Sequence, residues 1–169
     1  MKSHSTIYED GDFTHIDDGK SEFTKMTTDV AEHHIYNMLR TVHPKSNGIV
    51  SIVQITNKFI KLKQLDICLN RYTLADIKRE MGVVKDYLQS LGIMYIDWRP
   101  GNIGISREDG ELNLFDFDGS GIIDLETNEW SFPAPKMWAY RDAVKAGMKT
   151  PKEIDDYAFN KGFTSKISI

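Results

Sequence analysis

The chain has 169 residues, with 21 Lys or Arg against 25 Asp or Glu, so its formal charge at neutral pH is −4. This balance disfavours nucleic acid and anionic membranes as partners, because both attract basic proteins. The single cysteine, Cys68, excludes an internal disulfide framework and a cysteine-based zinc cluster. The amino terminus lacks an apolar signal core, and no run reaches the roughly 18 residues of a membrane helix. We therefore expect an intracellular, cytoplasmic protein without a membrane partner.

The first third of the chain predicts short strands and one helix. Five apolar or alternating segments are typical of strands, namely 6–8, 13–16, 21–26, 49–56 and 60–65. Asp18-Gly19 is a hairpin signal between the second and third of them. A helix capped by Thr28 or Asp29 should follow the third and end before His43-Pro44, because proline disfavours helix in the residue before it.

From Thr73 onward the pattern becomes mostly helical. Apolar residues three or four apart predict a helix of about five turns, and they are Leu74, Ile77, Met81, Val84, Leu88 and Leu91. Two short strands are expected at 103–106 and 112–115, an irregular stretch at 119–135, and helices at 137–146 and 151–161. Thr150 and Glu153 form a capping box for the last helix. The change in composition near Asp66 predicts two domains, 1–65 and 66–169.

Three polar residues carry the chemistry that we expect. Asp97 and Asn102 lie five positions apart in a loop, and Asp116 follows Asn102 at the end of a strand. Phosphoryl transfer needs such placement of charge rather than covalent chemistry. Asp116 and Asn102 offer oxygen ligands to Mg²⁺, and Asp97 would accept the proton of the attacking hydroxyl.

The same segments resemble the eukaryotic-type protein-kinase superfamily. Residues 95–102, YIDWRPGN, are similar to the H-R-D-L-K-P-E-N catalytic loop, and Asp116-Phe117-Asp118 is similar to D-F-G. Ala134-Pro135-Lys136 falls where A-P-E would be, and 155–159, DDYAF, resembles the opening of helix F. Across residues 20–161, the resemblance implies an α+β, kinase-like bilobal fold with a small β-rich N-lobe and an abbreviated helical C-lobe.

The resemblance also implies the nucleotide-binding residues. Glu32 would be the ion-pair glutamate of helix C, and Lys25 the phosphate-binding lysine, with Lys20 as its rival. Gly11 would be what remains of the glycine-rich loop, and Arg99, in place of the loop lysine, would steady the transferred phosphate. The implied cofactors are ATP with Mg²⁺ or Mn²⁺.

Several residues depart from the family pattern. Ile96 replaces the arginine that tethers a phosphorylated activation loop, so we expect no activation by loop phosphorylation. Asp118 replaces the glycine of D-F-G, the glycine-rich loop keeps one glycine of three, and the match ends soon after helix F. Such trimming resembles kinases of large DNA viruses or bacterial effectors, which would act in a host cell. A second copy or a partner protein would cover the exposed apolar surface.

The expected function is phosphoryl transfer from ATP to Ser or Thr of a protein substrate. A non-catalytic pseudokinase that acts as a decoy for a partner kinase is one alternative, favoured by the reduced glycine loop and Asp118. A small-molecule phosphotransferase is another, since a missing docking half matters less to a small substrate. Trp98, Trp130 and Trp138 are expected to be packing anchors rather than a ligand cage.

Overall fold

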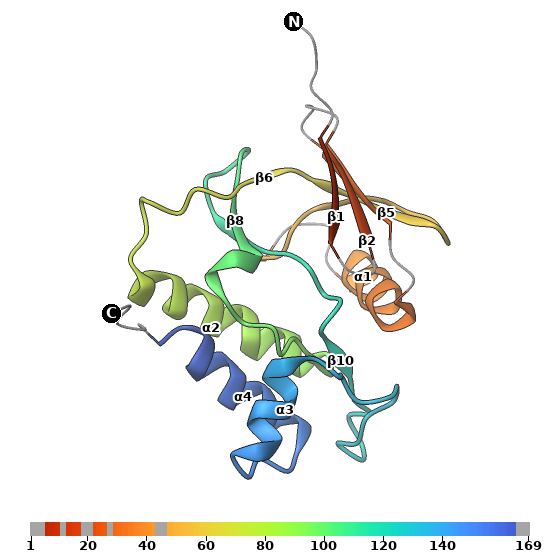
Figure 1. The fold of residues 1–169 in the computed structure, drawn as a ribbon, viewed down its shortest axis with the longest axis vertical. Helices are drawn as coiled ribbons and strands as arrows, with labels where there is room; N and C mark the ends of the chain where they lie inside the picture. Colours follow the sequence, from red (N-terminus) through yellow and green to blue (C-terminus); the bar gives the residue numbers. More distant parts are fainter. Residues whose placement is uncertain (1–5, 11–12, 18–21, 27–28, 43–46, 165–169) are drawn as a thin grey trace, which may run out of the picture.

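The structure is a computed structural model that describes residues 6–10, 13–17, 22–26, 29–42 and 47–164. Within these residues it has four α-helices and three antiparallel sheets, which confirms the predicted α+β class. The largest sheet and α1 form one end of the molecule, and α2, α3 and α4 gather at the other (Figure 1).

The largest sheet has five strands in the order β1-β2-β3-β5-β4. Their bounds are β1 Thr6–Asp10, β2 Phe13–Asp17, β3 Glu22–Met26, β4 Ile52–Ile55 and β5 Phe59–Lys63. The hairpin pairing predicted for β2 and β3 is confirmed, and β4 pairs with β5 in a second hairpin. Asp18-Gly19, the predicted turn between β2 and β3, lies outside the described residues. On β3, Lys25 stands opposite Ile60, a buried residue of β5.

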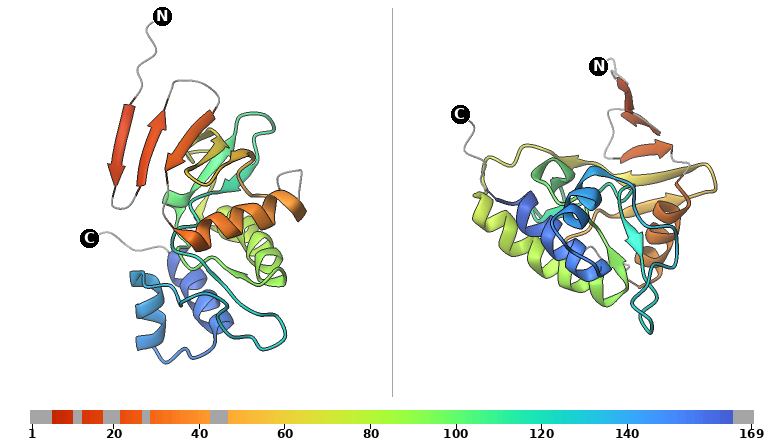
Figure 2. Two further views of the ribbon diagram at one scale, coloured as in Figure 1. Left: turned by 90° about the vertical axis from the view of Figure 1, so that its right-hand side faces the viewer. Right: turned by 60° about the horizontal axis from the view of Figure 1, so that its bottom comes forward.

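Helix α1, Val30–Val42, lies against this sheet (Figure 2). It begins after Asp29, whose Oδ1 accepts hydrogen bonds from the backbone of Ala31 and Glu32 at 2.8 and 3.2 Å. This cap confirms one of the two predicted capping residues, and it satisfies backbone donors that the helix itself leaves open. Thr28 and His43-Pro44 lie outside the described residues.

Helices α2, Leu74–Ser90, α3, Trp138–Lys145, and α4, Pro151–Gly162, agree with the predicted segments. The capping boxes of α2 and α4 are present, with Thr73 paired to Asp76 and Thr150 paired to Glu153. The periodic apolar face of α2 is buried through four residues, Ile77, Met81, Val84 and Leu88. Local sequence signals therefore determine these helices and their ends.

Two small sheets connect the helices. One has the order β6-β8-β9, from Leu65–Asp66, Ile103–Ser106 and Leu112–Leu114. The other pairs β7, Ile93–Met94, with β10, Gly121–Ile122. The irregular stretch predicted at 119–135 therefore contains a short strand, whose two residues are too few to show a periodic pattern. The predicted domain boundary at residues 65 and 66 falls inside β6.

The two ends of the molecule share one core. Ile49 forms a parallel bridge with Leu114, and Val50 donates to the Leu114 carbonyl at 2.9 Å, so the approach to β4 is attached to β9. Of the three tryptophans, Trp98 is buried and Trp130 half-buried, whereas Trp138 is 66% exposed. The prediction of a packing role is wrong for Trp138, because it lies on the outer face of α3. Among the described helices, none is both long enough and apolar enough to cross a bilayer.

Candidate functional site

A buried triad of charges joins β3, α1 and the segment after β9. The Lys25 ammonium lies 2.8 Å from Glu32 Oε2 and 2.7 Å from Asp116 Oδ1. The Lys25 and Glu32 side chains are 1% and 0% exposed, and buried charges of this kind need partners. Burial alone would lower the pKa of Lys25, but the two carboxylates outweigh it and raise the pKa above its usual value. Lys25 is therefore a permanent cation that links β3 and α1 to the distant segment that follows β9.

Glu32 also holds the backbone beside Asp116. The backbone N–H of Phe117 donates to Glu32 Oε2 at 3.0 Å, so the same oxygen receives Lys25 and the main chain. The Phe117 ring lies edge-on to Tyr36 of α1 at 5.2 Å and to Tyr95 at 5.1 Å between ring centroids. Aromatic pairs favour this geometry. Position 116 is thus fixed by a charge on one side and by packed rings on the other.

The loop between β7 and β8 places a second carboxylate. Asn102, in the short 3₁₀ turn Pro100–Asn102, donates its Nδ2 to the carbonyl of Asp97 at 3.0 Å and to Asp97 Oδ2 at 2.8 Å. Arg99 Nε lies 3.4 Å from Asp97 Oδ1, and the Arg99 side chain is 60% exposed. The structure therefore brings three predicted residues, Asp97, Arg99 and Asn102, into direct contact.

Backbone strain is concentrated at this site. Ile96 and Asp116 have φ angles of 68° and 62°, in the left-handed region that residues other than glycine rarely adopt. For β-branched Ile96 the strain is largest, and such residues persist only where their surroundings hold them. Strained non-glycine residues cluster at functional sites, which supports a functional role for the two loops that carry Asp97 and Asp116.

Asp155, a residue that the sequence reasoning did not include in the site, holds the strained loop. Its Oδ1 accepts hydrogen bonds from the backbone N–H of Ile96 at 2.9 Å and from Trp98 Nε1 at 2.8 Å. Its Oδ2 accepts from Gln89 Nε2 at 2.9 Å. Asp155 lies in the segment 155–159 that resembles the opening of helix F, and this resemblance is the sequence signal that points to it. Its contacts to Ile96 and Trp98 make it a positioning residue for Asp97.

The carboxyl groups of the site differ in acidity. Burial would raise the pKa of Asp116, but the Lys25 charge and a hydrogen bond with Asp118 hold it below its usual value. Burial and the neighbouring Asp116 charge raise the pKa of Asp118 to about 7. Burial also raises the pKa of Asp97, although Asn102 and Arg99 oppose the shift. The site thus holds one strongly ionised carboxylate beside two that bind protons more readily.

Asp116 and Asn102 offer oxygen atoms suited to a hard cation from neighbouring segments. The backbone N–H of Phe115 donates to the Asn102 carbonyl at 3.0 Å, which puts Asn102 next to the residue that precedes Asp116. Because the Asn102 Nδ2 is engaged by Asp97, its Oδ1 is the atom left to bind a cation. Among the residues described, no group of three His, Cys, Asp or Glu side chains forms a ready-made metal site. Mg²⁺ commonly uses one or two carboxylates plus phosphate oxygens, so this donor set fits it.

Two predicted residues lie outside the described part of the chain. Gly11, the predicted remnant of the phosphate loop, is one of them, and Lys20, the rival of Lys25, is the other. Lys25 is the lysine that contacts Glu32 and Asp116 in the structure.

Comparison with protein-family models and with curated proteins found no match to this chain.

Proposed function

We propose that the protein is a kinase-like phosphotransferase, with two lobes, that transfers the γ-phosphate of ATP to a Ser or Thr hydroxyl of a protein. The observation that carries this proposal is the convergence of Lys25, Glu32 and Asp116 from three segments. The hydrogen-bonded Asp97 and Asn102 in the neighbouring loop add to it. An ATP-dependent reaction and a single cysteine both fit the intracellular location that we also propose.

Each residue has a role in this proposal. Asp116 and Asn102 would hold Mg²⁺ or Mn²⁺, which supplies positive charge to the phosphates of ATP. Lys25, oriented by Glu32, would bind phosphate oxygens through its ammonium group. Arg99 is exposed beside Asp97, where its guanidinium could bind the transferred phosphoryl group. Gly11 would contribute backbone to the phosphate loop.

Asp97 would act as the proton acceptor. The hydroxyl oxygen forms a bond to the γ-phosphorus while the bond from that phosphorus to the β,γ-bridging oxygen breaks. The hydroxyl proton passes to Asp97, and the products are ADP and a phosphoester. Burial raises the pKa of Asp97, which makes its carboxylate a better proton acceptor.

The test is phosphate transfer from labelled ATP, with Mg²⁺ or Mn²⁺, to the protein itself and to generic protein substrates. Asp97→Asn should lower the rate by roughly 10²–10⁴-fold. Asp116→Asn should lower it by at least roughly 10²-fold, because metal charge stabilisation is worth several kcal/mol. Asp109→Asn is the matched control, since Asp109 is exposed in the turn between β8 and β9. Transfer that survives both site substitutions would contradict the proposal.

A binding protein without transferase activity is the second candidate. The observation that favours it is Asp118, a second carboxyl group hydrogen-bonded to Asp116. When Asp118 is ionised, its added negative charge repels the phosphates of a nucleotide unless a cation intervenes. Under this alternative the protein shows no ATP-dependent rise in melting temperature and captures a partner kinase. A rise in melting temperature that needs both ATP and Mg²⁺ would exclude it.

A further inference from the structure

The carboxy-terminal part of the chain has a charge opposite to that of the remainder. Residues 136–169 contain seven Lys or Arg against four Asp or Glu, whereas residues 1–135 contain fourteen against twenty-one. The four carboxylates of this part are already engaged. Asp142 pairs with Lys161, Asp156 pairs with Lys85, Glu153 accepts from the backbone of Thr150, and Asp155 binds the Ile96 loop.

Three cations on α3 and just before it have no such partner. Lys136, Arg141 and Lys145 are exposed, and within the described part of the chain none of them forms an ion pair. Arg141 Nε donates to the Lys136 carbonyl at 2.9 Å, which holds these two residues together. Arg141 and Lys145 are four positions apart and therefore share a helix face. We call Lys136, Arg141, Lys145 and the exposed Trp138 the basic stripe.

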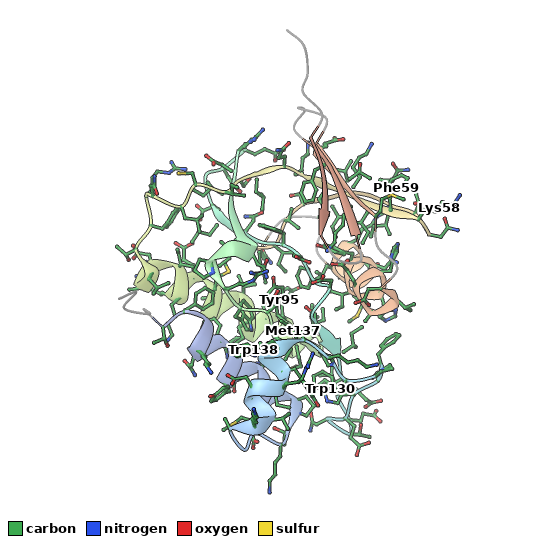
Figure 3. All side chains as sticks on the ribbon, viewed as in Figure 1. Lys58, Phe59, Tyr95, Trp130, Met137 and Trp138 are labelled. Atoms are coloured by element: carbon green, nitrogen blue, oxygen red, sulfur yellow. The ribbon has the colours of Figure 1, made fainter. Side chains whose placement is uncertain are left out.

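Trp138 adds an aromatic surface to the stripe. Its side chain is 66% exposed, and the Lys161 ammonium lies 5.3 Å from its ring centroid. Figure 3 shows Trp138 at the start of α3, directly after Met137. An exposed tryptophan beside unpaired cations is a composition typical of interfaces rather than of a solvated face.

The basic stripe begins next to the proposed catalytic carboxylate. A Cβ placed on Gly119 would lie 2.5 Å from the Met137 Sδ and 3.4 Å from the Asp97 Cβ. The absence of a side chain at Gly119 therefore lets Met137 pack close to Asp97. Lys136 and Trp138 flank Met137, so a chain that lies along α3 reaches Asp97 at one end.

We propose that the basic stripe docks an acidic segment of the protein substrate and so delivers a nearby Ser or Thr hydroxyl to Asp97. This inference rests on the proposed function, whose substrate class it specifies. Helix α3 has eight residues and is roughly 12 Å long, the length of about four extended residues of a bound peptide.

The surroundings of the stripe favour a short acidic segment over an extended polyanion. Three exposed carboxylates, Asp124, Glu126 and Glu129, lie in the loop that precedes Trp130. Trp130 contacts Tyr140 of α3, with ring centroids 6.1 Å apart, so this acidic loop is close to the stripe. A nucleic acid or an anionic membrane that extends beyond the stripe would meet these charges and the net negative charge of the protein.

The experiment compares three peptides that carry the same acceptor serine among acidic, neutral or basic neighbours. The triple variant Lys136→Glu/Arg141→Glu/Lys145→Glu should raise the KM for the acidic peptide about tenfold or more, with kcat changed much less. The matched control is Lys58→Glu/Arg71→Glu/Arg107→Glu, which changes the net charge equally at exposed positions away from α3. Lys58 lies at the far end of the sheet in Figure 3. The control should leave the KM unchanged.

A binding measurement separates this inference from the proposed function. Trp138 fluorescence should respond to the acidic peptide, and rising salt should weaken the response. Binding of the acidic peptide without phosphate transfer to any peptide would contradict the proposed function and support the docking surface. Transfer with equal KM for all three peptides would overturn the docking surface and keep the function.

Two further outcomes also decide the inference. Tighter binding of single-stranded RNA or of phosphatidylserine vesicles than of the acidic peptide, lost in the triple variant, would overturn it in favour of those partners. If charge reversal prevents folding, judged by circular dichroism, the neutral variant Lys136→Gln/Arg141→Gln/Lys145→Gln replaces it. An unchanged KM in that folded variant contradicts the proposal.

Discussion

The site residues at the two ends of the molecule are held in place by different interactions. The amino-terminal sheet and α1 supply Lys25 and Glu32, which are held by buried charge pairing. The helical part supplies Asp97 and Asn102 on a strained loop, which is held by hydrogen bonds and by Asp155. Asp116 belongs to the helical part by sequence, yet it contacts the ammonium group from the sheet.

The geometry of the Asp97 loop depends less on contacts between the two parts than the Lys25–Glu32 pair does. The loop of Asp97 is held from within the helical part by Asp155 on α4, which in turn accepts a hydrogen bond from Gln89 on α2. Lys25 and Glu32 gain their partner Asp116 only when the two parts meet. We therefore expect substitutions in the triad to weaken the packing of the sheet against the helical part. Substitutions around Asp155 should instead change the conformation of the Asp97 loop.

The largest effect is expected from breaking the triad. Lys25→Met should lower the free energy of unfolding by about 3–5 kcal/mol, because it leaves the buried Glu32 carboxylate without its cation. Urea unfolding followed by circular dichroism measures this loss. The double variant Lys25→Met/Glu32→Leu should recover only part of the stability, because the Phe117 N–H and the Asp116 carboxylate still lack their partners. It should recover none of the transferase activity. A Lys25→Met variant as stable as the parent would mean that the ion pair of Lys25 with Glu32 contributes little to stability.

Removing the carboxylate that holds the Asp97 loop should have the next largest effect. Asp155→Ala leaves the buried N–H groups of Ile96 and Trp98 without acceptors and should cost about 3 kcal/mol. Asp155→Asn keeps one acceptor oxygen and should cost much less. Calorimetric melting compares the two variants. Equal losses in both would show that charge, rather than acceptor geometry, holds the loop.

A pair of glycines tests the packing of α4 on the same loop. At Gly162 an added Cβ would lie 1.8 Å from the Trp98 carbonyl oxygen, so Gly162→Ala should destabilise by about 2 kcal/mol. At Gly82, on α2, the nearest atom is the Phe159 Cζ at 3.7 Å. Gly82→Ala should therefore stabilise by roughly 0.5–1 kcal/mol through helix propensity. Melting temperatures that move in the same direction for both would argue against the close approach of α4 to Trp98.

The stability of the protein should also depend on pH. Burial raises the pKa of Asp155 from 3.8 to about 6, although Gln89, Ile96 and Trp98 donate hydrogen bonds to it. The native state therefore binds this proton more tightly than the unfolded chain does. The contribution of Asp155 is complete below about pH 4 and is lost as the pH rises through about 6.

Asp155→Asn, which does not titrate, isolates this contribution. The parent's unfolding free energy minus that of the variant should fall by roughly 2 kcal/mol between pH 4 and about pH 7. Urea unfolding of both proteins at several pH values measures this difference. The contributions of the other carboxyl groups cancel when the two free energies are subtracted. A difference that rises with pH would mean that the hydrogen bonds outweigh burial.

Much of the fold could be predicted from local signals. Thr150 with Glu153 predicted where α4 begins, because a capping box satisfies backbone donors within one turn. The structure adds a second capping box, Thr73 with Asp76, at the start of α2. The strands β7 and β10 were not predicted, because a two-residue strand is stabilised by its partner across the sheet rather than by its own residues. The exposure of Trp138 was also missed, since a short helix with one bulky residue does not indicate which face meets the core.

The candidate site divides in the same way. The spacing of Asp97, Asn102 and Asp116 was visible in the sequence, and so was the short interval between Lys25 and Glu32. The holding role of Asp155 was not visible, because its partners Ile96 and Trp98 are more than fifty positions away. The contact of Met137 with the Asp97 loop across Gly119 was hidden for the same reason.

The sequence by itself determined the helices, the hairpin pairings and the identity of the polar residues, because caps, periodicity and turn residues act within a few positions along the chain. Only the tertiary structure decided that Lys25 meets Asp116, that Asp155 binds the strained loop, and that the cations of α3 form no ion pair with any residue the structure describes. Those contacts depend on which buried charges and donors meet when distant segments pack. Burial makes each of them costly to leave unsatisfied, and the packing of the whole chain selects their partners.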